Sequence, residues 1–99
     1  MKLDEVLDVI NSNEKVIVRF WATWCAPCKM MEPIVKRVVE GTDIKLVSVN
    51  VDEQIDVAEY FDVMSIPHFK AFKDGAEVAD LIGYRPEKIF KEQFVSKLE

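Results

Sequence analysis

Two cysteines separated by two residues are the side chains of this sequence best suited to redox chemistry. Cys25 and Cys28 are the only cysteines present, and a helical spacing of apolar residues begins just after them. A thiol attacks a disulfide only as the thiolate, and a free cysteine is only a few per cent ionised at neutral pH. The unpaired N–H groups and the positive dipole end of a helix start stabilise an anion. We therefore expect Cys25 to be the nucleophile.

The spacing of the pair predicts exchange in two steps. Two intervening residues let the sulfurs approach within one helical turn, and Pro27 restricts the loop. Cys25 would attack a substrate disulfide to give a mixed disulfide. Cys28 would then attack Cys25, which releases the reduced substrate and leaves an internal disulfide.

Two other interpretations fit a pair of cysteines at this spacing. A structural zinc site needs four ligands, and His68 is the only further nitrogen donor of the usual kind. The two cysteines could also be small buried apolar residues without chemistry, although Trp24 and Pro27 make their context specific. Exchange fits the residues better than either, and we expect no metal and no bound cofactor.

Composition indicates a single α/β domain over residues 1–99. The chain is 49% hydrophobic, which suffices for one core, and it shows neither repeats nor a linker-like stretch. The net charge of −5 comes from interspersed acids and bases, so we expect no nucleic-acid partner. The acidic start of the chain lacks the apolar run of a secretory signal, and no segment is apolar enough for a membrane helix. These features predict a cytoplasmic protein that does not bind a membrane.

Hydrophobic periodicity and turn residues predict the order αβαβαββα, with helices on both faces of a mixed sheet of about four strands. The Asp74-Gly75 pair is the strongest hairpin signal. The expected helices are 3–10, a segment from the cysteines to about Gly41, 55–61 and 86–98, and the expected strands are 15–22, 44–51, 68–73 and 76–82.

The sequence around the cysteines resembles the active-site signature of the thioredoxin family. Residues 20–29 read FWATWCAPCK, with Ala26 where that family usually has glycine. The resemblance implies a thioredoxin-like fold whose N-terminal strand is shortened or missing, because the chain opens on a helix. Further matches lie at Pro33, Asn50-Val51-Asp52, Ile66-Pro67, Lys73-Asp74-Gly75 and Gly83.

The resemblance also implies a substrate-binding rim around Cys25. The family's proline at Pro67 follows a cis peptide bond and faces the sulfurs, whereas an ordinary trans proline would merely open a strand. Ile66 would offer its backbone to an extended substrate. The remaining residues expected at the rim are Trp24, Ala26, Pro27, Gly83 and Tyr84, while Trp21 is at least as consistent with core packing.

Two departures from the family pattern concern charge. Thioredoxins usually have a buried aspartate where Arg19 stands and a lysine where Ser48 stands. Arg19 cannot accept a proton from Cys28. If it lies near the sulfurs, its charge should favour thiolate over disulfide and make the couple more oxidising. The alternative is that Arg19 reaches a surface carboxylate and does not contact the site.

His68 stands where the family commonly has threonine, directly after Pro67. Its ordinary pKa lies near neutrality, so it could tune Cys28 or contact substrate. A solvated or packed strand histidine is the more ordinary interpretation.

The function that follows is a protein disulfide reductase, an electron carrier in cell redox homeostasis. The resemblance implies protein disulfide substrates, recycling by an NADPH-dependent thioredoxin reductase and a monomeric state. Glutathione is an alternative reductant, although the residues between the cysteines are Ala-Pro rather than the Pro-Tyr of glutaredoxins. The alternatives are a non-catalytic binding or chaperone module of the same fold, and a disulfide oxidase or isomerase made more oxidising by Arg19.

Overall fold

The structure is a computed structural model that describes all residues from Met1 to Glu99. The order of elements is the one that the periodicity predicts, and the strand bounds agree to within a residue at each end. The elements are α1 (Leu3–Ser12), β1 (Lys15–Trp21), α2 (Ala26–Val39), β2 (Lys45–Asn50), α3 (Ile55–Tyr60), β3 (His68–Lys73), β4 (Ala76–Ile82), α4 (Glu87–Gln93) and a 3₁₀ helix, η1 (Val95–Leu98).

The last predicted helix, 86–98, is divided in two. The helical conformation stops at Gln93, and Phe94 takes φ −125° and ψ −62° before η1 begins. This turn directs Leu98 into the core, where it is 1% exposed. Burial of the terminal apolar residue therefore takes precedence over a continuous helical spacing.

Four strands form one mixed sheet in the order β2-β1-β3-β4. β1 and β2 are parallel and joined through α2, whereas β1–β3 and β3–β4 are antiparallel. Asp74 and Gly75 connect β3 to β4 with φ values of 51° and 84°, as the hairpin prediction requires. No strand precedes α1, which agrees with the expected shortened or missing N-terminal strand.

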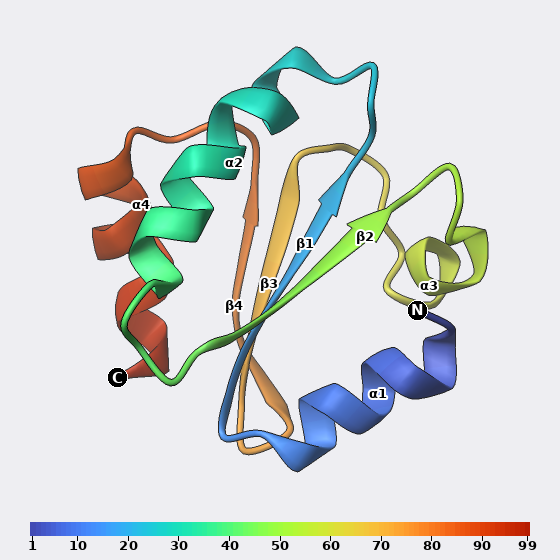
Figure 1. The fold of residues 1–99 in the computed structure, drawn as a ribbon, viewed down its shortest axis with the longest axis horizontal. Helices are drawn as coiled ribbons and strands as arrows, with labels where there is room; N and C mark the ends of the chain where they lie inside the picture. Colours follow the sequence, from blue (N-terminus) through green and yellow to red (C-terminus); the bar gives the residue numbers. More distant parts are fainter.

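Helices cover both faces of the sheet, with α2 and α4 on one side and α1 and α3 on the other (Figure 1). β1 is central, so its side chains alternate between two cores. Val16, Val18 and Phe20 belong to the core under α1 and α3, while Ile17 belongs to the core under α2 and α4. Arg19 occupies the same side of the strand as Ile17, which places a cation beneath α2.

The cysteine pair lies where β1 ends and α2 begins. In Figure 1, the chain leaves the C-terminal end of β1, makes a short loop and enters α2 at the same end of the sheet. Parallel β1 and β2 present their carboxyl ends together there, so the residues that follow β2 lie beside the loop. No helix is both long and apolar enough to cross a bilayer.

Candidate active site

Cys25 and Cys28 form a disulfide across the first turn of α2, with their Cα atoms 5.3 Å apart. Cys25 is the N-cap of the helix, and its sulfur accepts a hydrogen bond from the Cys28 backbone N–H at 3.2 Å. Cys25 is 4% exposed and Cys28 is 0% exposed. The expected internal disulfide is therefore present, and it is held in a dry environment.

The sequence of the first turn explains why the helix begins here. Ala26 is the first helical residue, and Pro27 follows where a missing N–H costs no helical hydrogen bond. The helix then continues through Pro33 to Val39 and buries Met31 and Val35 against the sheet. In this turn the Cys28 N–H donates to the sulfur of Cys25, where a helix start stabilises negative charge.

The loop before β3 brings Ile66 and Pro67 to the disulfide. The Ile66–Pro67 peptide bond is cis, as the resemblance implies. Ile66 packs against the buried cluster that contains both cysteines, while Pro67 accepts a hydrogen bond from the Gly83 N–H at 2.8 Å. Neither backbone group of Ile66 has a hydrogen-bond partner within the chain, so both remain available to a docking strand.

Exposed side chains border the disulfide on the helix and loop side. Trp24 is 68% exposed, and Ala26 and Pro27 are also exposed. Tyr84 follows Gly83 and is 39% exposed. Trp24, Ala26 and Pro27 thus form an exposed, mostly apolar border next to the buried cysteines.

Asp52 is a site residue whose contact the sequence did not predict. Its Oδ2 accepts a hydrogen bond from Trp24 Nε1 at 2.9 Å, which ties the cysteine loop to the turn after β2. The two residues are 28 positions apart, and no local pattern joins them. Only the alignment of the ends of β1 and β2 brings them together.

Arg19 lies directly beneath the cysteines, so the alternative of a surface-directed side chain is wrong. It is 5% exposed, and its Nη2 donates a hydrogen bond to the Cys28 carbonyl at 2.9 Å. Its guanidinium carbon lies 5.4 Å from the centre of the Trp21 ring. Burial lowers the pKa of Arg19 from its ordinary value, and the Glu32 carboxylate opposes that shift.

Ser48 is the register partner of Arg19 on β2 and is exposed.

His68 is a packed strand histidine on the opposite face of the sheet from Arg19. It is 4% exposed, its Nε2 lies 2.6 Å from Asp80 Oδ1, and its ring lies 5.8 Å from that of Phe20. His68 directly follows Pro67 in the chain, but its imidazole faces Phe20 and Asp80 rather than Cys28. The ordinary interpretation of His68 thus fits the structure better than a role in tuning Cys28.

Asp80 also pairs with Lys70, whose Nζ lies 3.2 Å from the carboxylate. Desolvation raises the pKa of Asp80, but hydrogen bonds with His68 and Lys70 outweigh it and leave the pKa below its ordinary value. For Lys70, desolvation lowers the pKa, and the bonds to Glu77 and Asp80 outweigh this effect and leave it raised. These charged side chains link β3 to β4.

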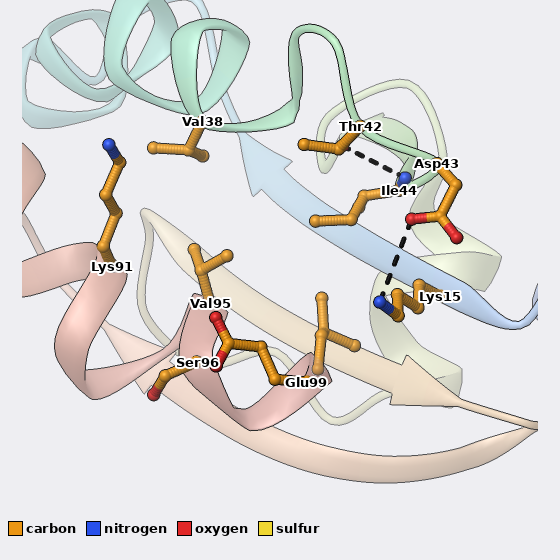
Figure 2. Close-up of a pocket in the computed structure, with 10 residues that line it drawn as sticks. Lys15, Val38, Thr42, Asp43, Ile44, Lys91, Val95, Ser96 and Glu99 are labelled. Atoms are coloured by element: carbon orange, nitrogen blue, oxygen red, sulfur yellow. Dashed lines mark hydrogen bonds and ion pairs between the residues drawn. The ribbon is translucent and has the colours of Figure 1, made fainter.

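One cavity lies away from the cysteines. It has a volume of about 340 Å³ and lies near the C-terminal end of α2, where Val38, Thr42 and Val95 line it. Figure 2 shows Lys15 and Asp43 closing one side through an ion pair of 3.9 Å. None of the expected site residues lines it, and no cluster of His, Cys, Asp or Glu in the structure has the arrangement of a metal site.

Comparison with known proteins gives consistent matches over most of the chain. A family model described as Thioredoxin matches residues 4–96. The chain is 42% identical over 78 residues to the thioredoxin of Mycobacterium tuberculosis, which covers 77% of this chain and 67% of the relative. It is 37% identical over 92 residues to the thioredoxin of Alicyclobacillus acidocaldarius, which covers 91% and 88% of the two chains.

Solved structures agree with the sequence comparisons. A mutant thioredoxin from Halobacterium salinarum superposes with a TM-score of 0.86 at 34% identity, covering 97% of this chain and 85% of the other. Oxidised mitochondrial thioredoxin 3 from Saccharomyces cerevisiae gives 0.84 at 35% identity, covering 93% and 88%. The similarity thus extends over most of the chain, including the segment that carries Cys25 and Cys28.

Proposed function

Because this chain belongs to the thioredoxin family, we propose that Cys25 attacks and Cys28 resolves in its exchange with protein disulfides. Thioredoxins are protein-disulfide oxidoreductases, and the dithiol–disulfide exchange of the family is the activity of this chain. The observation that supports the assignment of roles is the hydrogen bond from the Cys28 N–H to the Cys25 sulfur. It supports Cys25 as the sulfur that the helix start would stabilise as an anion.

The two steps follow from that arrangement. The Cys25 thiolate attacks one sulfur of the substrate disulfide, and the other substrate sulfur leaves with the electron pair and takes a proton from water. Cys28 then loses its proton and attacks Cys25, which expels the second substrate thiolate and forms the internal disulfide. Two electrons pass from the cysteine pair to the substrate.

We propose that Ile66, Pro67 and the rim bind the substrate in extended form. The free backbone groups of Ile66 support pairing with a substrate strand, and Gly83 lies next to Pro67 through its hydrogen bond. Trp24, Ala26, Pro27 and Tyr84 would cover the apolar side chains on either side of the substrate cysteine. His68 and Arg19 take no part in this surface, because the imidazole pairs with Asp80 and the guanidinium lies beneath the cysteines.

The test is reduction of insulin by the chain with dithiothreitol as electron source. Cys25→Ser should abolish the reaction. When the protein is reduced beforehand and the dithiothreitol is removed before insulin is added, Cys28→Ser should complete the first step and accumulate a mixed disulfide through Cys25, which intact-mass measurement detects as one added substrate chain. Accumulation with Cys25→Ser, and none with Cys28→Ser, would reverse the assigned roles.

We further propose recycling by an NADPH-dependent thioredoxin reductase. Members of the family act on protein disulfides and are reduced by such a reductase. One solved structure with 34% identity to this chain concerns thiol resolution in a yeast mitochondrial peroxiredoxin through glutathione and thioredoxin systems. Consumption of NADPH with purified reductase should depend on Cys25. If glutathione, but not the reductase, reduced the oxidised chain, this proposal would be wrong and glutathione would be the reductant.

We propose that residues 1–99 form one cooperative folding unit, that the chain is a monomer and that it works as an electron carrier in the cytoplasm. Sedimentation should give a single species near the chain mass of 11.4 kDa. Denaturant unfolding should show one transition by both tryptophan fluorescence and circular dichroism. Two separate transitions would contradict the single unit.

A further inference from the structure

Arg19 is a buried cation with little to balance its charge in the disulfide form. The single hydrogen bond of its side chain goes to the neutral carbonyl of Cys28, and its Nε has no partner. No carboxylate lies within ion-pair distance of the guanidinium, although Glu32 interacts with it at longer range. A buried charge without a close counter-ion destabilises the state that contains it.

The surroundings of Arg19 connect it to the sulfurs. Its guanidinium lies over Trp21, and Trp21 packs against the buried cluster of Ala22, Cys25 and Cys28. The hydrogen bond to the Cys28 carbonyl brings the charge to the residue whose sulfur is fully buried. A thiolate formed at Cys28 would therefore arise in a dry environment close to an unbalanced cation, where the attraction is strong.

We propose that Arg19 is a positioning residue for the resolving step, which fixes the first turn of α2 through the Cys28 carbonyl and stabilises the Cys28 sulfur as a thiolate. The inference rests on the proposed function, because it assigns Cys28 the second attack. Cys28 loses its proton, its thiolate attacks Cys25 in the mixed disulfide, and the substrate sulfur leaves with the electron pair and takes up a proton, so that no net proton is released. No buried carboxylate is needed to remove the proton.

Glu32 limits this effect. It follows Cys28 by one helical turn on α2, its side chain is 50% exposed, and it pairs with Lys36 at 3.3 Å. Its carboxylate partly offsets the field of Arg19 without contacting it. Removal of Glu32 and removal of Arg19 should therefore change the thiolate population of Cys28 in opposite directions.

The experiment measures the ionisation of Cys28 alone. In a Cys25→Ser background, the thiolate absorbance is followed against pH for the parent and for Arg19→Met, Arg19→Lys and Glu32→Gln. Arg19→Met keeps an apolar stem of similar length and removes the charge, and it should lower the thiolate fraction at a fixed pH about tenfold, as loss of a close opposite charge does. Arg19→Lys should retain most of the thiolate, and Glu32→Gln should increase it.

The expected tenfold decrease in the thiolate fraction corresponds to a shift of about one unit in the titration midpoint of Cys28. A thiolate fraction that changes by less than about twofold in Arg19→Met would overturn the proposal. Arg19→Met could fail to fold because the site is buried. In that case Glu32→Gln, on the exposed side of α2, decides the question. A thiolate fraction that is unchanged or lower in this variant would contradict the proposal.

A second readout separates electrostatics from packing. With both cysteines present, Arg19→Met should shift the equilibrium with glutathione toward the protein disulfide about tenfold, which is roughly 30 mV for a two-electron couple. A purely structural role would lower the stability of both redox forms and leave that equilibrium in place. If the unsubstituted chain failed to reduce insulin, the proposed function would be lost, whereas the Cys28 titration would still decide the role of Arg19.

Discussion

Trp24 Nε1 donates a hydrogen bond to Asp52 Oδ2 at 2.9 Å, although 28 residues separate the two positions. The indole is 68% exposed, so this bond rather than burial holds the ring beside Cys25. The bond therefore connects the loop before α2, which carries part of the proposed rim, to the turn that follows β2.

Substitution Asp52→Ala should reduce kcat/KM for protein disulfides about two- to fivefold. An exposed hydrogen bond to a charged acceptor contributes on the order of 1 kcal/mol, and its loss frees the ring to leave the rim. Insulin reduction at several concentrations measures the effect. Asp52→Asn is the matched control because its amide oxygen still accepts, and it should stay within twofold of the parent. Equal losses in both variants would show that the charge of Asp52, and not the bond, matters.

Substitution Gly83→Ala should destabilise the fold by about 1–3 kcal/mol. Gly83 has φ +97°, a conformation that residues with a Cβ rarely adopt, and its N–H bonds the Pro67 carbonyl. The added Cβ would lie 3.4 Å from the Arg85 side chain, so backbone strain is the main cost rather than a clash. Urea unfolding measures the change. Gly41 has φ +75°, and a Cβ added there would have no close neighbour. Gly41→Ala should therefore lower the free energy of unfolding by a similar amount without affecting insulin reduction.

Truncation of Phe69 should cost about 3–5 kcal/mol, as for other buried aromatic residues. Phe69 is 0% exposed, and its ring lies 5.1 Å from Phe90 and 6.0 Å from Phe94. Phe69→Ala would leave a cavity between β3 and the C-terminal helix α4. Met64→Ala, at a position 86% exposed, should change the free energy of unfolding by less than about 0.5 kcal/mol. A loss for Phe69→Ala no larger than that of Met64→Ala would contradict the packing seen here.

The Asp80 cluster predicts a loss of stability in acid. The pKa of Asp80 is lower in the folded chain than its ordinary value of 3.8, so its contribution is present above that pH and is lost as the pH falls through the folded pKa. Asp80→Asn should therefore be less stable than the parent at neutral pH, and the difference should shrink as the pH falls below about 4. Unfolding at a series of pH values measures this difference. A difference that is constant over the whole series would show that the ionisation of Asp80 contributes nothing.

Local patterns account for most of the fold. The apolar periodicity located every helix and strand, because burial of one stripe or one face imposes a spacing that survives in the sequence. The Asp74-Gly75 turn fixed the hairpin, since both residues tolerate a positive φ. The exception is the helix end at Gln93, where packing of Leu98 changes the backbone at Phe94.

The chemistry of the site was also predictable in its main parts. Cys25 and Cys28 lie close in the chain, so a single helical turn suffices to join them, and the sequence motif carries the nucleophile, the proline and the helix start together. Ile66 and Pro67 followed from the family resemblance, and the structure packs Ile66 against the pair. Glu32 was missed, although its spacing of four from Cys28 places the two on neighbouring turns of one helix.

The sequence by itself determined the redox pair and the elements that carry it, because both depend on spacings within one segment. Only the tertiary structure decided what surrounds the pair. Whether Arg19 reaches the surface or Cys28 depends on how α2 crosses β1, and the partner of Trp24 depends on the pairing of β1 with β2. Contacts between distant segments are set by packing and hydrogen bonding of the assembled sheet, and no local spacing encodes them.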